Sequence, residues 1–536
     1  MKQGLQLLDY VVFFIYFIAV SSYGFWIYKK KSSKETSSTD YFLAEGSLTF
    51  WAIGASLIAS NISAEHFIGM SGSGFAIGLA IASYEWMAAA TLVVVAIFFV
   101  PIYLKNKIYT MPQFLRQRYN PVVATTMAIF WLLLYVFVNL TSILYLGALA
   151  LEVTAGIDFN WAIGALAIFA IIITVGGMKV IGYTDVIQVI VLIAGGLVTT
   201  YLAMDLVAKQ FGNPNVFSAF GTLKAQAEPH FHMILKKDNP YYKDLPGLSV
   251  IIGAMWINNL NYFGCNQYII QRTLGASLPT ARKGLLFAAG LKLIIPIIVV
   301  IPGIAAYVLF QNGMFQTEML DVNGVVKPDH AYPVLLDLLP SGLKGMAFAA
   351  LTAAIVASLA GKANSISTIF TLDIYREYIK PDASEKHLIR VGRYAIWTSM
   401  GIAALIAPQL RVLEQAYQFI QEYSSFITPG VFAIFFLGFF WKRTTGNAAL
   451  VAALLTIPLS TAFKFWYEEI PFLNRMGIIF LILVAIIIVV TLLDPKSKNN
   501  PKGLEIDRSM FKVSNGFMIT SILIFGILGA LYCVFW

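Results

Sequence analysis

Long apolar segments recur along almost the whole chain, and they constrain its fold more than any other feature. Of the 536 residues, 58% are hydrophobic and only 12% are charged, whereas about a quarter of the residues are charged in a typical soluble domain. A run of about 18 apolar residues is long enough to cross the hydrocarbon core of a bilayer. The sequence therefore predicts an all-α polytopic membrane protein.

Fourteen segments meet this length criterion. They lie approximately at residues 8–28, 50–76, 79–104, 122–154, 158–176, 183–206, 248–268, 284–310, 343–373, 391–408, 413–441, 447–466, 475–493 and 513–535. Lys and Arg concentrate in alternate connections, as the positive-inside rule requires. The cationic connections, which are predicted to lie inside, contain Lys29 to Lys34, Lys105 to Arg118, Lys179, Arg272 to Lys283, Arg376 to Arg393, Lys442 with Arg443, and Lys496 to Lys512.

This alternation predicts a multi-pass protein of the cytoplasmic membrane with both termini outside. The predicted outer segment 207–247 is long enough for short surface helices and an external lid. The net charge of +9 does not indicate a nucleic-acid partner, because the basic residues are scattered through short loops and are not gathered on one soluble face. Cys265 and Cys533, the two cysteines of the chain, specify neither a disulfide framework nor a metal site. No obligate protein partner is inferred.

A polar cluster interrupts the second apolar segment at Ser60–Phe67, where a charge at mid-depth costs roughly 2.5 to 3.5 kcal/mol. A second polar run, Asn258–Gly264, lies in the seventh segment, five segments later. Because five is an odd number, the second set of five segments enters the membrane from the opposite side. Interrupted segments at matching places in two oppositely oriented halves predict an inverted-repeat transporter with its site near the midplane. Ordinary polar contacts between helices are the alternative.

Few ionisable residues lie inside the predicted spans. They are Glu65, His66, Glu85, Asp185, Lys292 and Lys362, with Glu152 and Lys464 nearer the ends. Carboxylate and amide oxygens accept hydrogen bonds from hydroxyl groups, and a lysine donates them. A substrate carboxylate favours an arginine fork, and no arginine lies deep in the spans that could line a site. The set therefore favours a neutral, hydroxyl-rich solute, although Glu85 with Lys292 can also be read as a structural ion pair.

At these residues the chain resembles the sodium:solute symporter family, and within it the sodium/glucose and sodium/galactose cotransporter branch. The similarity covers essentially the whole chain. The motifs that carry it are Ala59–Met70, Ile81–Trp86, Val138–Ser142, Gly176-Gly177 followed by Tyr183–Gln188, Asn266–Thr273 and Phe370–Tyr375.

The resemblance implies a leucine-transporter-like fold of about 14 transmembrane helices around two inverted five-helix repeats. The expected parts are an extra N-terminal helix and loop (1–49), the first repeat (50–206), an external loop (207–247), the second repeat (248–441) and three C-terminal helices (442–536). Sugar would bind between the broken helices. By this resemblance the substrate-binding residues are Asn61, His66, Met70, Tyr84, Glu85, Asn259, Tyr262, Lys292, Tyr417 and Gln421, with Tyr262 closing the inner side.

The resemblance also implies a sodium site, formed by the carbonyl oxygens of Ala59, Ile62 and Ala354 together with Ala357 and Ser358. Asp185 matches an acidic position on the ion path. The family pattern has two adjacent hydroxyl residues where this chain has Ala357-Ser358, so one ligand is missing. Lys362 follows Ser358 by one helical turn on the same face. It could repel sodium, pair with Asp185, or extend toward the inner surface without affecting the ion.

The expected function is sodium-coupled symport of a neutral, galactose- or glucose-like monosaccharide by alternating access, with sodium as the coupling ion and no cofactor. Proton-coupled or uncoupled sugar uptake, with Lys362 altering the sodium site, is an alternative. A membrane sensor that binds sugar without transporting it is another. The sequence contains no set of nucleophile, base and orienting group that predicts an enzyme.

Overall fold

The computed structural model describes residues 5–31, 48–174, 178–320, 324–412, 416–504 and 506–536. Helices dominate these residues, and the described part of the chain contains no β-strand, only an isolated bridge between Leu320 and Val326. The chain is thus an all-helical protein, as predicted. Gly176, Gly177 and most of the predicted connection after the first span lie outside the described residues.

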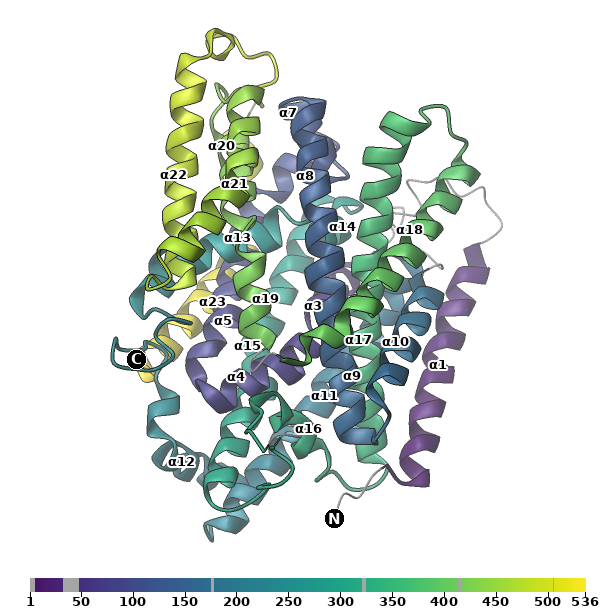
Figure 1. Cartoon of the computed structure of the whole chain (residues 1–536), viewed down its shortest axis with the longest axis vertical. Coiled ribbons are helices and arrows are strands. Elements are labelled where there is room, and N and C mark those ends of the chain that lie inside the picture. The colour runs from purple at the N-terminus through teal and green to yellow at the C-terminus, as the bar shows by residue number, and fades with distance from the viewer. Residues whose placement is uncertain (1–4, 32–47, 175–177, 321–323, 413–415, 505) are drawn as a thin grey trace.

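The α-helices follow one another in a long bundle (Figure 1). In chain order they are α1 (Leu7–Lys31), α3 (Phe50–Asn61), α4 (Ser71–Ala76), α5 (Ser83–Phe98), α6 (Val100–Lys105), α7 (Met111–Arg118), α8 (Pro121–Leu133), α9 (Thr141–Ala155), α10 (Phe159–Thr174), α11 (Met178–Gln210), α12 (Val216–Gln226), α13 (Met255–Gly264), α14 (Gln267–Leu274), α15 (Leu278–Gln311), α16 (Ala331–Leu336), α17 (Leu343–Thr368), α18 (Glu385–Ile406), α19 (Ala416–Ser424), α20 (Thr428–Phe440), α21 (Gly446–Trp466), α22 (Phe472–Leu493) and α23 (Asn515–Val534).

Shorter helical turns join or extend several of these helices. The π-helical turns are η2 (Glu65–Met70), η4 (Leu134–Leu140), η6 (Val250–Ala254) and η8 (Ile369–Ile379). The 3₁₀ turns are η3 (Leu79–Ala82), η5 (Glu228–Phe231), η7 (Pro328–His330), η9 (Ala407–Val412), η10 (Pro495–Ser497) and η11 (Arg508–Phe511).

Nine helices of the described residues are long and apolar enough to cross a membrane, or ten if the bent pair α19 and α20 forms one span. Helical residues lie in each of the fourteen predicted ranges, but the described apolar parts of α1, α3 and α10 are shorter than 18 residues. The count of fourteen spans and the inverted repeat therefore remain predictions.

The predicted break at the first polar cluster is present. Helix α3 ends at Asn61, Ile62 has an extended backbone (φ −81°, ψ 115°), and the π-helical turn η2 begins at Glu65. The last carbonyl groups of α3 therefore have no following helical turn whose amides could donate hydrogen bonds to them. This leaves backbone oxygens exposed to neighbouring helices at the centre of the bundle.

The second predicted interruption was placed too early. The polar run Asn258–Gly264 is continuous helix within α13, and the break comes at Cys265 and Asn266, before α14 begins. Asn266 caps α14 by accepting a hydrogen bond from the amide of Tyr268, at 3.2 Å. An amide side chain suits a helix N-cap, so the new helix starts after Asn266, and α13 is not interrupted at its asparagines. The predicted span 413–441 is also bent, by 48° between α19 and α20.

Helix α15 organises the centre of the molecule, because it packs against α3, α4, α5 and α11. Glycines allow the close approach: a Cβ atom on Gly54 would lie 2.7 Å from the carbonyl oxygen of Gly284, and one on Gly303 would overlap the carbonyl oxygen of Ser71. Helix α17 is buried along almost its entire length and packs against α3, α9, α10 and α11.

The segment 207–247 contains the short helix α12 and the turn η5, which agrees with the predicted surface helices. It packs against the end of the chain: the amide of Met233 donates to the carbonyl of Phe535 at 2.7 Å, and the ring of His232 bonds the carbonyl of Trp536. In Figure 1, α12 and α16 lie at the same end of the bundle as the beginning of α1.

Candidate binding site at the broken helices

A cavity of about 80 Å³ lies at the breaks. Eight of the ten residues predicted to bind substrate line it, namely Asn61, His66, Tyr84, Glu85, Asn259, Tyr262, Tyr417 and Gln421. Met70 and Lys292 lie behind this wall. Glu65 and Lys362, which the sequence did not assign to the substrate, line the cavity as well. Segments far apart in sequence therefore converge on one polar space.

Glu85 and Lys292 form a buried ion pair beside the cavity. The lysine Nζ lies 2.8 and 2.6 Å from the two carboxylate oxygens, and Lys292 is completely buried. His66 Nε2 contacts Glu85 Oε1 at 3.3 Å. Lys292 also donates to the side-chain oxygen of Asn61, whose Nδ2 donates to the hydroxyl of Tyr262 at 3.2 Å. One network therefore connects the broken helix to α5, α13 and α15.

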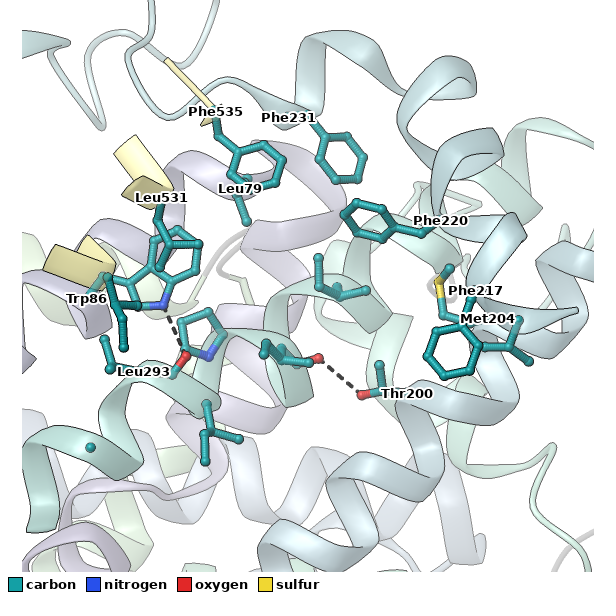
Figure 2. Close-up of a pocket in the computed structure, with 17 residues that line it drawn as sticks. Leu79, Trp86, Thr200, Met204, Phe217, Phe220, Phe231, Leu293, Leu531 and Phe535 are labelled. Atoms are coloured by element: carbon teal, nitrogen blue, oxygen red, sulfur yellow. Dashed lines mark hydrogen bonds between the residues drawn. The ribbon is translucent and has the colours of Figure 1, made fainter. Parts of the chain in front are cut away.

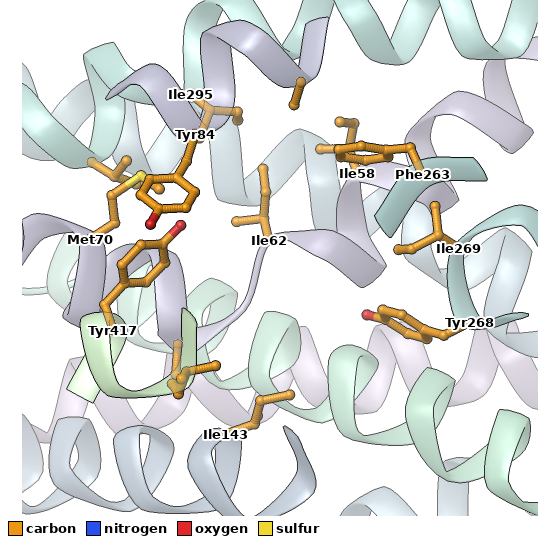
Figure 3. Packing of buried hydrophobic residues seen from close by; sticks show 14 of the residues in the cluster. Ile58, Ile62, Met70, Tyr84, Ile143, Phe263, Tyr268, Ile269, Ile295 and Tyr417 are labelled. Carbon is orange, nitrogen blue, oxygen red and sulfur yellow. The ribbon is translucent and has the colours of Figure 1, made fainter. Parts of the chain in front are cut away.

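Two tyrosines cover one side of the cavity. The rings of Tyr84 and Tyr417 meet edge to face, with centroids 5.4 Å apart. Figure 3 shows their hydroxyl groups pointing toward one another, with Met70 next to Tyr84. Asn259 Nδ2 donates to the carbonyl of Tyr84 at 3.4 Å. Met70 thus supports the aromatic wall from behind, in place of lining the cavity itself.

Lys362 pairs with Glu65, at 3.6 Å between Nζ and Oε2. Its side chain is only 4% exposed, so it does not extend to the inner surface, and its carboxylate partner is Glu65 in place of Asp185, the partner that the sequence had allowed. The other carboxylate oxygen of Glu65 accepts from Ser142 Oγ at 2.9 Å. A second ion pair, absent from the sequence interpretation, therefore joins α17 to the broken helix. These partners are 297 residues apart in the chain, too far for any local pattern to reveal.

The predicted ion residues lie where α17 meets the end of α3. Ser358 Oγ donates to the carbonyl of Ser60 at 2.8 Å and lies 3.2 Å from the hydroxyl of Tyr268. Ala354 and Ala357 are buried on the same helix, and Ala59 and Ile62 are buried at the break. The structure thus brings the two halves of the predicted ion site together. Ala357 supplies no oxygen from its side chain.

Arg272 is the main polar residue near this site that the sequence interpretation missed. It was assigned to an inner loop, but it is buried in α14. Its Nε donates to Ser56 Oγ at 2.9 Å, and its other nitrogens donate to Ser60 Oγ and the carbonyl of Tyr268. Ser56 in turn donates to Asp185 Oδ2 at 2.7 Å. The Asn266–Thr273 motif contains Arg272, and that motif was the one signal that could have identified it.

Asp185 keeps one oxygen available in this arrangement. Its Oδ1 atom is buried and has no hydrogen-bond partner among the described residues. A buried carboxylate oxygen normally has a partner, and an unsatisfied one is of the oxygen type that hard cations prefer. The role of Asp185 on an ion path stays a prediction.

Charges around the cavity are balanced. Two carboxylates, Glu65 and Glu85, face two ammonium groups, Lys362 and Lys292. An anionic solute would have to displace a carboxylate to reach either cation. A neutral solute with several hydroxyl groups can bond to this network without disturbing its charge balance.

Known proteins resemble this chain throughout its length. The pattern of the sodium:solute symporter family matches residues 41–456. The chain is 46% identical, over 100% of its length and 99% of the relative, to the sodium/glucose cotransporter of Vibrio parahaemolyticus. It is 34% identical to the human sodium/myo-inositol cotransporter 2, over 87% of this chain and 72% of that protein.

The fold is also similar to that of solved structures. A sodium-coupled sialic acid symporter in a substrate-bound, outward-open state superimposes with a TM-score of 0.78 at 24% identity, and the match covers 91% of this chain and 98% of that chain. The family pattern covers residues 41–456, which is more than half of the chain. The chain therefore belongs to the sodium:solute symporter family.

Proposed function

We propose that the protein carries a neutral monosaccharide, galactose- or glucose-like, across the cytoplasmic membrane together with sodium. The observation that carries this proposal is the charge-balanced cavity at the broken helices, in which amide, carboxylate and lysine groups meet two tyrosine rings. Hydroxyl groups can both donate to and accept from such a set, and an aromatic face can cover the apolar side of a sugar ring. The names of the two relatives support a sugar or polyol as the solute.

In this proposal Asn61, His66, Glu85, Asn259 and Gln421 hold the sugar, and Lys292 acts through its bonds to Glu85 and Asn61. Tyr84 and Tyr417 form the outer wall with Met70 behind them, and Tyr262 closes the inner side. Release inward would break the bond between Asn61 and Tyr262. A single neutral hydrogen bond contributes about 1 kcal/mol, so Tyr262 can open without a large barrier.

Sodium would bind between the end of α3 and α17, at the carbonyl groups of Ala59, Ile62 and Ala354 and the hydroxyl of Ser358, with Asp185 farther along its path. A tenfold inward gradient supplies about 1.4 kcal/mol, and about 100 mV supplies about 2.3 kcal/mol per charge. One sodium ion would then sustain roughly several hundred-fold accumulation of sugar. Coupling requires only that sodium bind the outward-facing state more tightly than the inward-facing one.

The proposed architecture has fourteen spans. The first repeat (50–206) and the second repeat (248–441) would enclose the site in opposite orientations, joined by the external loop (207–247). The N-terminal part (1–49) and the three C-terminal helices (442–536) would flank this core, with both termini outside. The breaks at Ile62 and at Cys265–Asn266 support this arrangement, because each lies in the first helix of its proposed repeat.

Sugar uptake without sodium is a second candidate, and one contact favours it. Lys362 places a buried ammonium group one helical turn from Ser358 and holds it by Glu65. A fixed cation there can take over part of the role of sodium, since α17 lacks one of the expected hydroxyl groups at Ala357.

The proposed substrate class is tested with purified full-length protein in proteoliposomes, using a panel of radiolabelled solutes. We expect saturable uptake of neutral monosaccharides, with hexuronates and amino acids at background. Glu85→Gln should lower sugar uptake at least tenfold, while Glu468→Gln, in the connection between α21 and α22, should leave it unchanged. Faster uptake of a hexuronate than of any neutral sugar would contradict the substrate class. Sugar binding without flux would indicate a sensor.

A further inference from the structure

A second and much larger cavity lies behind the candidate site. It measures about 770 Å³ and is bounded by α5, α11, α12, α15 and α23 (Figure 2). Its lining is almost entirely apolar, with aromatic rings from Trp86, Phe220, Phe231 and Phe535. A hydrophobic volume of this size is characteristic of a binding site for a small apolar ligand.

The polar groups of this lining are already bonded within the protein. Trp86 Nε1 donates to the carbonyl of Leu293 at 3.2 Å, and Thr200 Oγ1 donates to the carbonyl of Ile297 at 3.1 Å. Figure 2 shows both bonds along the cavity wall. Ordered water needs two to four polar partners, and cavities lined by apolar groups stay dry. Water is therefore a poor occupant of this cavity.

One face of α15 separates this cavity from the sugar site. Gly290, Leu293, Ile297 and Ile301 all line the cavity, and their spacing of three or four residues places them on one side of the helix. Lys292 points to the opposite side, where it meets Glu85. The apolar cavity is thus a distinct site that shares a helix with the polar one.

The mouth of the cavity combines lipid-facing and cationic residues. Ile297, on the candidate membrane span α15, is 45% exposed, and Phe217 on α12 is 89% exposed. Lys224, also on α12, holds its ammonium group 5.5 Å from the ring centroid of Phe535. The opening therefore meets the hydrocarbon region along α15 and a positive charge at its outer end. This is the charge distribution that a phospholipid complements, with apolar chains and a phosphate.

We propose that this cavity binds one acyl chain of a bilayer phospholipid, with the lipid phosphate at Lys224. An unfilled cavity would forfeit the dispersion contacts of its lining, and the bilayer supplies apolar chains at the mouth. The test of this site measures lipid labelling and not sugar uptake, so its failure is distinguishable from failure of the proposed function.

Gly290 offers a direct test, because a Cβ atom added there would meet no atom within 4 Å. Gly290→Leu should fill part of the cavity without a clash. Gly164→Leu is the matched control: Gly164 is also a half-buried helical glycine with open space around it, but it lies on α10, away from the cavity. Both changes replace glycine in a helix interior by a better helix former.

The full-length protein is reconstituted in phosphatidylcholine vesicles that contain phosphatidylglycerol with a diazirine on one acyl chain. After illumination, labelled peptides are quantified by mass spectrometry. We expect labelling of the lining residues in 216–231 and 527–535 in the unmodified protein and in Gly164→Leu. In Gly290→Leu this labelling should fall at least fivefold, while labelling of the exposed face of α22 stays constant.

Equal labelling of the lining in Gly290→Leu and Gly164→Leu, or no labelling of the lining at all, would overturn the proposal. Lys224→Gln provides a second variant on an exposed side chain, which carries no risk to folding. It should reduce labelling of the lining about two- to threefold at low salt, with a smaller effect at high salt because salt screens exposed charges. No reduction at low salt would overturn the assignment of the phosphate to Lys224.

Discussion

At the scale of single residues, the two ion pairs of the cavity differ in position: one lies on the sugar side, and the other lies next to the proposed ion site. Glu85 and Lys292 are bonded at 2.6 Å and connect the sugar side of the network. Glu65 and Lys362 are farther apart, at 3.6 Å, and link the broken helix to the helix that carries Ser358. Removing one partner of a buried pair leaves an uncompensated charge, which is costly. The two pairs should therefore respond differently to substitution.

Lys362→Met should raise the affinity for sodium. The substitution removes the ammonium group near the ion site and leaves the Glu65 carboxylate to attract a cation. We expect the sodium concentration for half-maximal sugar uptake to fall about fivefold, which corresponds to about 1 kcal/mol. Ala357→Ser, which restores a hydroxyl ligand beside Ser358, should shift it in the same direction. Sodium titration of sugar uptake in proteoliposomes measures both.

Glu65→Gln is the opposite change, because it leaves Lys362 as an unpaired cation in the cavity. The sodium requirement should then rise. If Lys362→Met and Ala357→Ser both left the sodium titration unchanged, Lys362 would have no influence on the ion, and the contact with Glu65 would be structural only.

Asp244 in the outer segment predicts a pH effect on stability. Burial, together with the nearby Glu422 carboxylate, raises the pKa of Asp244 to about 6. The folded state therefore binds this proton more tightly than the unfolded state, so stability is lost as the pH rises from about 4 through 6. Asp244→Asn should raise the apparent melting temperature at about pH 7.5 and have little effect at about pH 4.

The exposed Asp238, in the same segment, provides the control. Asp238→Asn should leave the melting temperature nearly unchanged at both pH values. An equal shift for Asp244→Asn at both pH values would show that protonation of Asp244 is not the cause.

At the scale of elements, the contact between α4 and α15 depends on a glycine. A Cβ atom on Gly303 would overlap the carbonyl oxygen of Ser71 and lie 3.0 Å from the amide of Phe75. Gly303→Ala should therefore lower the apparent melting temperature of the purified protein below that of the unmodified protein. Gly290→Ala on the same helix meets nothing and should stabilise the protein by about 0.5–1 kcal/mol, because alanine is the better helix former. Equal effects of the two changes would contradict the packing described for α15.

The sequence predicted the elements better than it predicted their breaks. Each of the fourteen apolar runs contains helical residues, because length and hydrophobicity are local properties, whereas the short helices α7, α12 and α16 lie outside these runs. The break at Ile62 follows from the polar cluster around it. The second break was misplaced because Asn258 to Asn261 read as an interruption, whereas these side chains project from a continuous helix toward the cavity.

Apart from the ion pair of Glu85 with Lys292, which the sequence analysis offered as one interpretation, contacts between distant elements could not be predicted from the sequence. The residue types of Glu65, Lys362 and Arg272 were visible, but their partners lie on helices far away in the chain. Arg272 was assigned to a loop because charged residues near the end of a span usually face water. Its burial against Ser56 and Ser60 depends on how α14 packs across α3, which is a tertiary property.

At the scale of the whole molecule, polar contacts join the elements that alternating access would have to move. Glu85 and Lys292 connect α5 with α15, Asn61 and Tyr262 connect the broken helix with α13, and Ser358 bonds the end of α3 from α17. A ligand at the ends of α3 and α17 can therefore bias the geometry of the sugar cavity. Such a bias is the condition for coupling two solutes in one transport cycle.

Sodium-driven accumulation of sugar tests this account most directly. Purified protein in proteoliposomes is given the preferred neutral monosaccharide with an inward sodium gradient, and then with choline in place of sodium at the same pH and membrane potential. The account predicts accumulation above the external concentration only with the sodium gradient, increasing when the interior is made negative. Accumulation that persists without sodium at constant pH would contradict it.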